Sequence, residues 1–284
     1  MESRDILRFF RRAIRRLPGD ILKTAIVTCF VFPFYWMACT AFKPYSEAIR
    51  VPVTFWPKAF SLEGLYSITN VRSINILQYL RNSVLITLST VLLQVAVLVP
   101  AAYAFARYEF FGKKALFSLV LLALMIPGQV TYITVYLTMS DWGMLETLLP
   151  QILPAGANAF GIFLLRQGFM QLPEEIIESA KLDGASEGKT ILHILLPMCF
   201  SVLLTIMLFS FVGTWNSYFW PLVMTNSESV RPLTMLLVRV MDSELGTRWN
   251  EIMAANLLVV LPVLFVYLFT SNRIIRAFTY NGLK

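Results

Sequence analysis

Residues 83–106, SVLITLSTVLLQVAVLVPAAYAFA, decide the class of fold because none of them is Asp, Glu, Lys or Arg. A helix needs about 20 apolar residues to cross a hydrocarbon core of about 30 Å. Three further tracts have no charged residue, and they cover 115–140, 190–227 and 252–272. The chain is 14% charged, against about 25% in a typical soluble domain. The sequence therefore predicts membrane-spanning helices and argues against a soluble globular domain.

Two less uniform stretches complete the predicted spans. Residues 24–42 are uncharged and follow a basic N-terminus, and residues 144–165 carry one acid, Glu146. We interpret the first as a signal anchor, because it is long for the apolar region of a cleaved signal peptide. We expect an all-α integral membrane protein, with a cytoplasmic basic segment over 1–23 and one transmembrane domain over 24–284. Its six helices are predicted at about 24–42, 83–106, 115–139, 144–165, 194–224 and 252–272.

The placement of Lys and Arg predicts the orientation. With the N-terminus inside, 16 of the 24 Lys and Arg residues fall in cytoplasmic segments and eight in outer ones. Cytoplasmic segments carry the excess of positive charge in membrane proteins, so both termini are expected in the cytoplasm. The net charge of +7 is then explained by contact with membrane lipid headgroups, and we expect no nucleic-acid partner.

The reactive residues exclude several classes of protein. Cys29, Cys39 and Cys199 lie in or beside apolar spans, and their spacing fits no metal site or disulfide framework. His193 is the only histidine, so no metal is expected and no catalytic constellation is present. Within the later spans the only acid is Glu146, which argues against a proton-relay pump. A channel is harder to exclude from the residues alone.

Prolines lie within each predicted span. Each proline removes a backbone donor and tends to kink its helix, which suits a transporter that rearranges. Proline is also simply more frequent in transmembrane helices, so the two readings stay open. The prolines are Pro33, Pro100, Pro127, Pro154, Pro221 and Pro262.

The predicted cytoplasmic loop over 172–197 reads LPEEIIESAKLDGASEGKTILHILLP. Pro173 and the acids after it favour a helix start, Gly184 ends that helix, and Ser186 is placed to cap a second one. The first helix is amphipathic, so it is either a float on the membrane surface or a docking element for a cytoplasmic partner. Gly188-Lys189-Thr190 looks like the end of a phosphate-binding loop. However, Asp183 stands where that motif needs glycine and no strand precedes it, so we do not expect this chain to bind ATP.

This loop resembles the EAA loop of bacterial ABC import permeases, written EAA, three residues, G, nine residues, I, one residue, LP. Here Glu178-Ser179-Ala180 is followed at these spacings by Gly184 and then by Ile194-Leu195-Leu196-Pro197. The one departure is Ser179 in place of the middle alanine. Residues 81–114, 211–225 and 249–284 are similar to the carbohydrate importers of the maltose-permease type, although the end, FTYNGLK, departs from their glycine-rich tail.

The resemblance implies the type I ABC importer permease fold in a bacterial plasma membrane. It implies four kinds of partner: a second homologous permease subunit, two ATP-binding subunits, an extracytoplasmic sugar-binding protein and membrane lipid. No cofactor is expected on this chain, because ATP and Mg²⁺ would be bound by the ATPase subunits. The coupling residues implied are Glu178, Ser179, Ala180, Asp183, Gly184, Ile194 and Pro197.

Residues 211–221, FVGTWNSYFWP, are the predicted solute path. Aromatic rings present flat faces to sugar C–H groups, and amide and hydroxyl groups bond hydroxyls. The predicted path residues are Trp215, Asn216, Ser217 and Tyr218; Trp220 fits an aromatic belt at the outer interface equally well. This stretch carries no Lys or Arg, which favours a neutral solute, an oligosaccharide, over the alternative of glycerol phosphate or another small polar solute.

Overall fold

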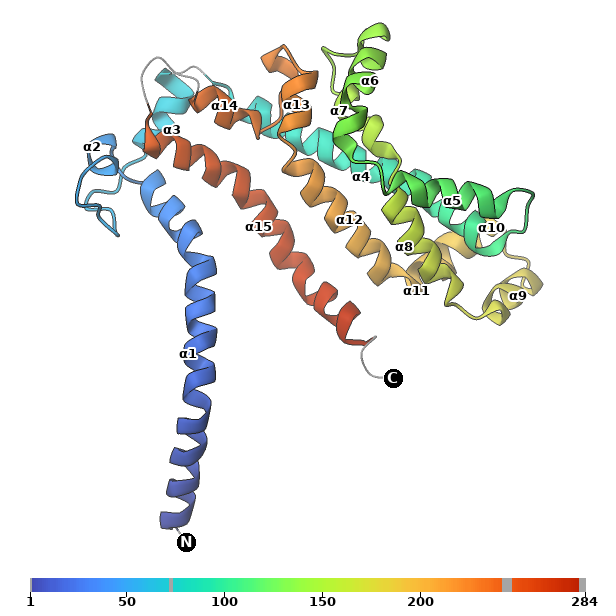
Figure 1. Cartoon of the computed structure of the whole chain (residues 1–284), viewed down its shortest axis with the longest axis horizontal. Coiled ribbons are helices and arrows are strands. Elements are labelled where there is room, and N and C mark those ends of the chain that lie inside the picture. The colour runs from blue at the N-terminus through green and yellow to red at the C-terminus, as the bar shows by residue number, and fades with distance from the viewer. Residues whose placement is uncertain (1, 72–73, 242–246, 281–284) are drawn as a thin grey trace. The chain divides into compact units, whose positions relative to one another are not determined.

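The computed structural model describes residues 2–71, 74–241 and 247–280, and the elements it assigns in them are helical (Figure 1). Side chains are described for 19–70, 74–241 and 247–271. The chain divides into two compact units. One unit comprises residues 1–74 with 239–258, and the other comprises 75–238 with 259–284.

The first unit holds α1 (Glu2–Ala41), α2 (Tyr45–Ala48), α3 (Glu63–Tyr66), a π-helical turn (Ser67–Val71) and the first part of α15 (Trp249–Tyr280). Two buried acids organise its loops. The Thr54 hydroxyl donates to Glu47 at 2.6 Å, and this hydrogen bond holds the pKa of Glu47 below its usual value. Glu251 is fully buried, pairs with Arg248 at 2.8 Å and accepts from the Ser67 hydroxyl at 2.6 Å.

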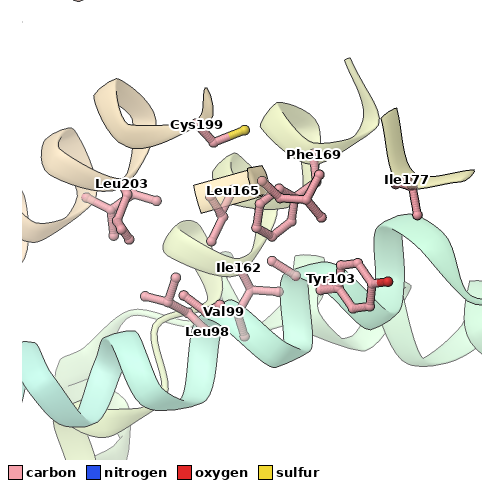
Figure 2. Packing of buried hydrophobic residues seen from close by; sticks show 12 residues of the cluster. Leu98, Val99, Tyr103, Ile162, Leu165, Phe169, Ile177, Cys199 and Leu203 are labelled. Carbon is pink, nitrogen blue, oxygen red and sulfur yellow. The ribbon is translucent and has the colours of Figure 1, made fainter. Parts of the chain in front are cut away.

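The second unit is built on the long helix α4 (Ile76–Arg107), against which α8 (Ala159–Met170) and α12 (Phe200–Trp215) pack. Figure 2 shows their shared core, in which Leu98 and Tyr103 lie near Leu165, Phe169 and Leu203. Gly161 lets α8 and α12 approach closely, because an added Cβ would lie 3.0 Å from Ile206. The remaining elements are α5 (Lys113–Ala123), α6 (Gly128–Asp141), α7 (Leu149–Ile152), α9 (Glu174–Leu182), α10 (Glu187–Thr190), α11 (Leu196–Met198), α13 (Phe219–Met224) and α14 (Met235–Met241), with 3₁₀ turns at Pro154–Gly156 and Glu228–Val230 and a π-helical turn at Ile191–Leu195.

Three helical stretches in the described residues are long and apolar enough to cross a membrane: Gly19–Ala41, Ile76–Arg107 and Trp249–Ser271. Two helix pairs qualify when each is taken as one bent span, α5 with α6 at 98° and Glu187–Met198 with α12 at 84°. That makes up to five spans, and α8 is a shorter apolar helix of 12 residues. The number six stays a prediction.

Three of the expected helices are interrupted. The stretch 115–139 breaks before α6, where Pro127 is in an extended conformation with ψ 129°. The stretch 144–165 is not one helix but α7, a 3₁₀ turn and α8, because Pro154 and the capping residue Asn158 start new turns. The stretch 194–224 breaks at Cys199 and again after Trp215. Glu146 lies in the turn before α7, where its carboxylate accepts from the Ser227 amide at 3.2 Å.

Candidate coupling loop and solute path

The helix α9 presents one face to the protein core and another to solvent. Ile177 and Ala180 are buried, and Ile177 belongs to the core cluster formed by α4, α8 and α12 (Figure 2). Glu178 and Ser179 are exposed on the opposite side, and Leu182 is 89% exposed. Ile177 therefore ties α9 to the helix packing and leaves its other face open to solvent.

Gly184 stops this helix with a left-handed residue. Its φ is +72°, the Gly184 amide donates to the Lys181 carbonyl at 3.0 Å, and the Ala185 amide donates to the Ala180 carbonyl at 2.9 Å. These two bonds form the glycine-ended helix terminus known as a Schellman motif. A Cβ at Gly184 would meet no atom within 4 Å, so the turn requires glycine for its backbone conformation rather than for lack of space. Asp183 precedes it as the C-cap and is exposed.

The second half of the loop returns to the core. Ser186 is at the N-cap of α10, as expected, but its side chain makes no capping bond. Leu195 is fully buried in the core cluster, Ile194 is half-buried and Pro197 is exposed. The structure thus brings Ala180 and Ile194 inward, and it leaves the other five predicted coupling residues on the surface.

The end of α4 holds both halves of the loop, which the sequence reasoning missed. The Arg107 guanidinium donates to the carbonyls of Phe169 and Leu172 at 2.6 and 2.7 Å. The Tyr108 hydroxyl donates to the Glu187 carboxylate, and that bond raises the pKa of Tyr108 to about 12. The positions of Arg107 and Tyr108 at the end of an uncharged tract gave no signal of these partners, which lie 62 to 79 residues away.

The four predicted path residues have different environments in the structure. Trp215 is 3% exposed and its indole N–H donates to the Val259 carbonyl at 3.0 Å, so its ring is part of the helix packing. Asn216 and Tyr218 are exposed. Ser217 lines a cavity of about 360 Å³, together with residues of α4, α6, α7 and α13. Their role in transport stays a prediction.

The comparisons with known proteins agree with this architecture. The family described as "Binding-protein-dependent transport system inner membrane component" matches residues 97–280. The diacetylchitobiose uptake system permease protein DasC of Streptomyces coelicolor is 28% identical over 96% of this chain and 99% of its own length. The arabinooligosaccharides permease AraQ of Halalkalibacterium halodurans is 27% identical over 89% and 91%.

A second group of relatives has a different named solute. The sn-glycerol-3-phosphate permease UgpE of Brucella abortus is 25% identical over 90% of this chain and 93% of its own length. A crystal structure of a bacterial ABC transporter for the acidic polysaccharide alginate superposes with a TM-score of 0.81, at 20% identity, over 92% of this chain and 96% of that chain. That likeness shows the fold. This chain therefore belongs to the family of binding-protein-dependent transport system inner membrane components, which are permease subunits of ABC importers rather than enzymes.

Proposed function

We propose that this chain is one of two related permease subunits that carry a neutral sugar, an oligosaccharide, into a bacterial cell by alternating access. The observation that supports it most is α9, with its exposed face and its buried anchor Ile177. A cytoplasmic ATPase that closes on ATP and Mg²⁺ would push that face. Because α9 shares a core with α4, α8 and α12, the push would move the pathway helices together.

The assembly follows from this proposal. Two ATP-binding subunits would dock on the coupling loops, a second homologous permease would supply the other half of the pathway, and an extracytoplasmic sugar-binding protein would deliver the solute. This chain is also similar, at a TM-score of 0.62, to a chain of a solved alginate ABC transporter complex. That complex includes a periplasmic protein with bound alginate pentasaccharide, which supports a binding-protein partner for this chain. We place both termini in the cytoplasm of a bacterial plasma membrane, on the distribution of Lys and Arg.

The test is the complete importer, reconstituted in liposomes with the binding protein of the same transport system. Diacetylchitobiose, arabinotriose and sn-glycerol 3-phosphate are offered, and ATP hydrolysis and uptake are measured. We expect a neutral sugar to stimulate both activities. The chain reconstituted alone should neither hydrolyse ATP nor take up solute. Uptake by the chain alone would indicate that it is a channel instead.

The second candidate, a phosphate ester, is favoured by the UgpE relatives and by one structural feature. Arg81 lines a polar hollow of about 250 Å³ with Gln78, Asn82 and Ser229, where a cation can attract an anion. The variant Arg81→Gln separates the two candidates. It should slow phosphate-ester uptake several-fold, and it should leave uptake of a neutral sugar within about twofold.

A further inference from the structure

A cavity of about 360 Å³ lies within the second unit, in the size range of small-molecule sites, which is about 300–1,000 Å³. Its lining residues come from α4, α6, the α7 region, α12 and α13. Gly128 and Gly213 are among them, and an added Cβ at Gly213 would meet no atom within 4 Å. The chain thus leaves open space beside two glycines on different helices.

Aromatic rings form one part of the lining. Tyr132 and Trp220 line the cavity, with ring centroids 5.0 Å apart. The Trp220 indole N–H donates to the Pro150 carbonyl at 2.8 Å, which fixes the orientation of the ring. Phe219 stacks on Tyr132 at 5.3 Å. Rigid aromatic faces suit the C–H face of a sugar ring.

Polar groups without charge form another part. Gln151 is 4% exposed and lines the cavity; its Nε2 donates to the Val230 carbonyl at 3.0 Å. Its Oε1 is buried and has no hydrogen-bond partner within the described part of the chain, so the contribution of Gln151 to the cavity is neutral lining rather than an open acceptor. The hydroxyl residues Thr87, Thr214 and Ser217 also line the cavity.

We propose that this cavity binds one neutral, hydroxyl-bearing sugar ring during transport, with Tyr132 and Trp220 against its C–H face and the Thr214 and Ser217 hydroxyls bonding to its hydroxyl groups. The lining residues in the described chain include no Asp, Glu, Lys, Arg or His, so an anion would be bound there without a countercharge. This inference rests on the proposed function and names the substrate site on this subunit.

The test uses two pairs of matched variants in the complete importer. Gly213→Leu fills the open space in the cavity, and its control Gly19→Leu adds the same bulk at a helical glycine of α1 that likewise has no atom within 4 Å. Tyr132→Ala removes an aromatic face, and its control Tyr136→Ala alters a residue of α6 that is absent from the lining. Uptake of diacetylchitobiose and arabinotriose is measured at equal amounts of assembled complex.

We expect Gly213→Leu to lower uptake at least tenfold and Tyr132→Ala to lower it about three- to tenfold, with both controls within twofold of the unmodified importer. If the unmodified importer takes up a neutral sugar but both cavity variants match their controls, the cavity site is wrong and the proposed function stands. If it takes up only sn-glycerol 3-phosphate, or none of the three solutes, the proposed function fails and this inference fails with it. If only Gly213→Leu fails to assemble, uptake by Tyr132→Ala decides whether the cavity binds the sugar.

Discussion

The coupling loop and the solute cavity lie in the same compact unit, but they are built in opposite ways. The loop is one continuous segment, in which the Gly184 turn is closed by bonds between residues three to five apart. The cavity takes single residues from segments that run from Ser83 to Pro232. A segment closed by local bonds keeps its shape without help from distant parts of the chain, whereas a cavity lined by distant segments exists only when those segments are packed together.

The largest expected effect tests the local character of the loop. Gly184→Leu should lower coupled uptake about tenfold or more while the protein still inserts, because a left-handed non-glycine residue costs on the order of 1–3 kcal/mol. Uptake and stimulated ATP hydrolysis are measured in proteoliposomes. Gly184→Asn, which tolerates positive φ better, should retain much of both. Normal transport by Gly184→Leu would refute the docking assignment.

Arg107→Met tests whether the loop also depends on a distant anchor. It removes the bonds to the Phe169 and Leu172 carbonyls, and hydrogen bonds from a charged group contribute about 1.5–3 kcal/mol. We expect faster proteolysis of the loop and about a tenfold loss of uptake. Arg107→Lys keeps the charge without the planar guanidinium group, so its proteolysis and uptake should lie between those of the unmodified protein and Arg107→Met. Unchanged proteolysis would mean that the loop holds its shape without α4.

Asn216→Leu asks how far the path extends beyond the cavity. Asn216 is exposed at the end of α12 and is absent from the cavity lining. We expect a loss of sugar uptake of about two- to tenfold, from one hydrogen bond worth about 0.5–1.5 kcal/mol, with normal assembly. Asn226→Leu, another exposed amide, is the control. A loss greater than that of Gly213→Leu would move the main solute contact to this turn.

The smallest effect concerns the contact between Tyr108 and Glu187. A tyrosine whose pKa is raised to about 12 contributes stability that is fully present below its ordinary pKa of about 10 and is lost as the pH rises through 12. Proteolysis of the loop should therefore not change between pH 6 and 9. Tyr108→Phe should accelerate it less than about threefold at every pH in that range. A step in the unmodified protein near pH 8 would contradict the assigned pKa.

The prolines show what the residues leave undecided. Pro100 and Pro262 lie inside continuous helices, whereas Pro127 comes at a 98° break. From the sequence the three prolines look alike, because each removes one backbone N–H donor. Whether a helix continues past its proline is therefore visible only in the structure. Residues 144–165 fail as a single helix for a related reason: Asn158, whose side chain accepts from the Gly161 amide at 2.9 Å, starts α8 late.

Trp215 and Gln151 show the same limit for the site. Trp215 is the more obvious sugar contact in the sequence, yet its indole donates to Val259, 44 residues away. Gln151 could have been identified from the sequence as a lining residue, because a polar amide within an apolar stretch usually faces protein or water. The partners of its side-chain oxygen and nitrogen, however, depend on which distant segments fold against it.

The sequence by itself determined the membrane class, the helical fold and the family, and it predicts the coupling loop. The class and the helical fold follow from the length of the uncharged tracts, and the family and the loop follow from spacings within about 20 residues. A backbone turn such as that at Gly184 is governed by local sterics. Only the tertiary structure decided where the helices break, that Arg107 and Tyr108 hold the loop, and that a cavity without charged lining lies between α4, α6 and α13. These depend on side chains from distant segments meeting in space, and the positions of such contacts are set by packing, which no single stretch of the chain contains.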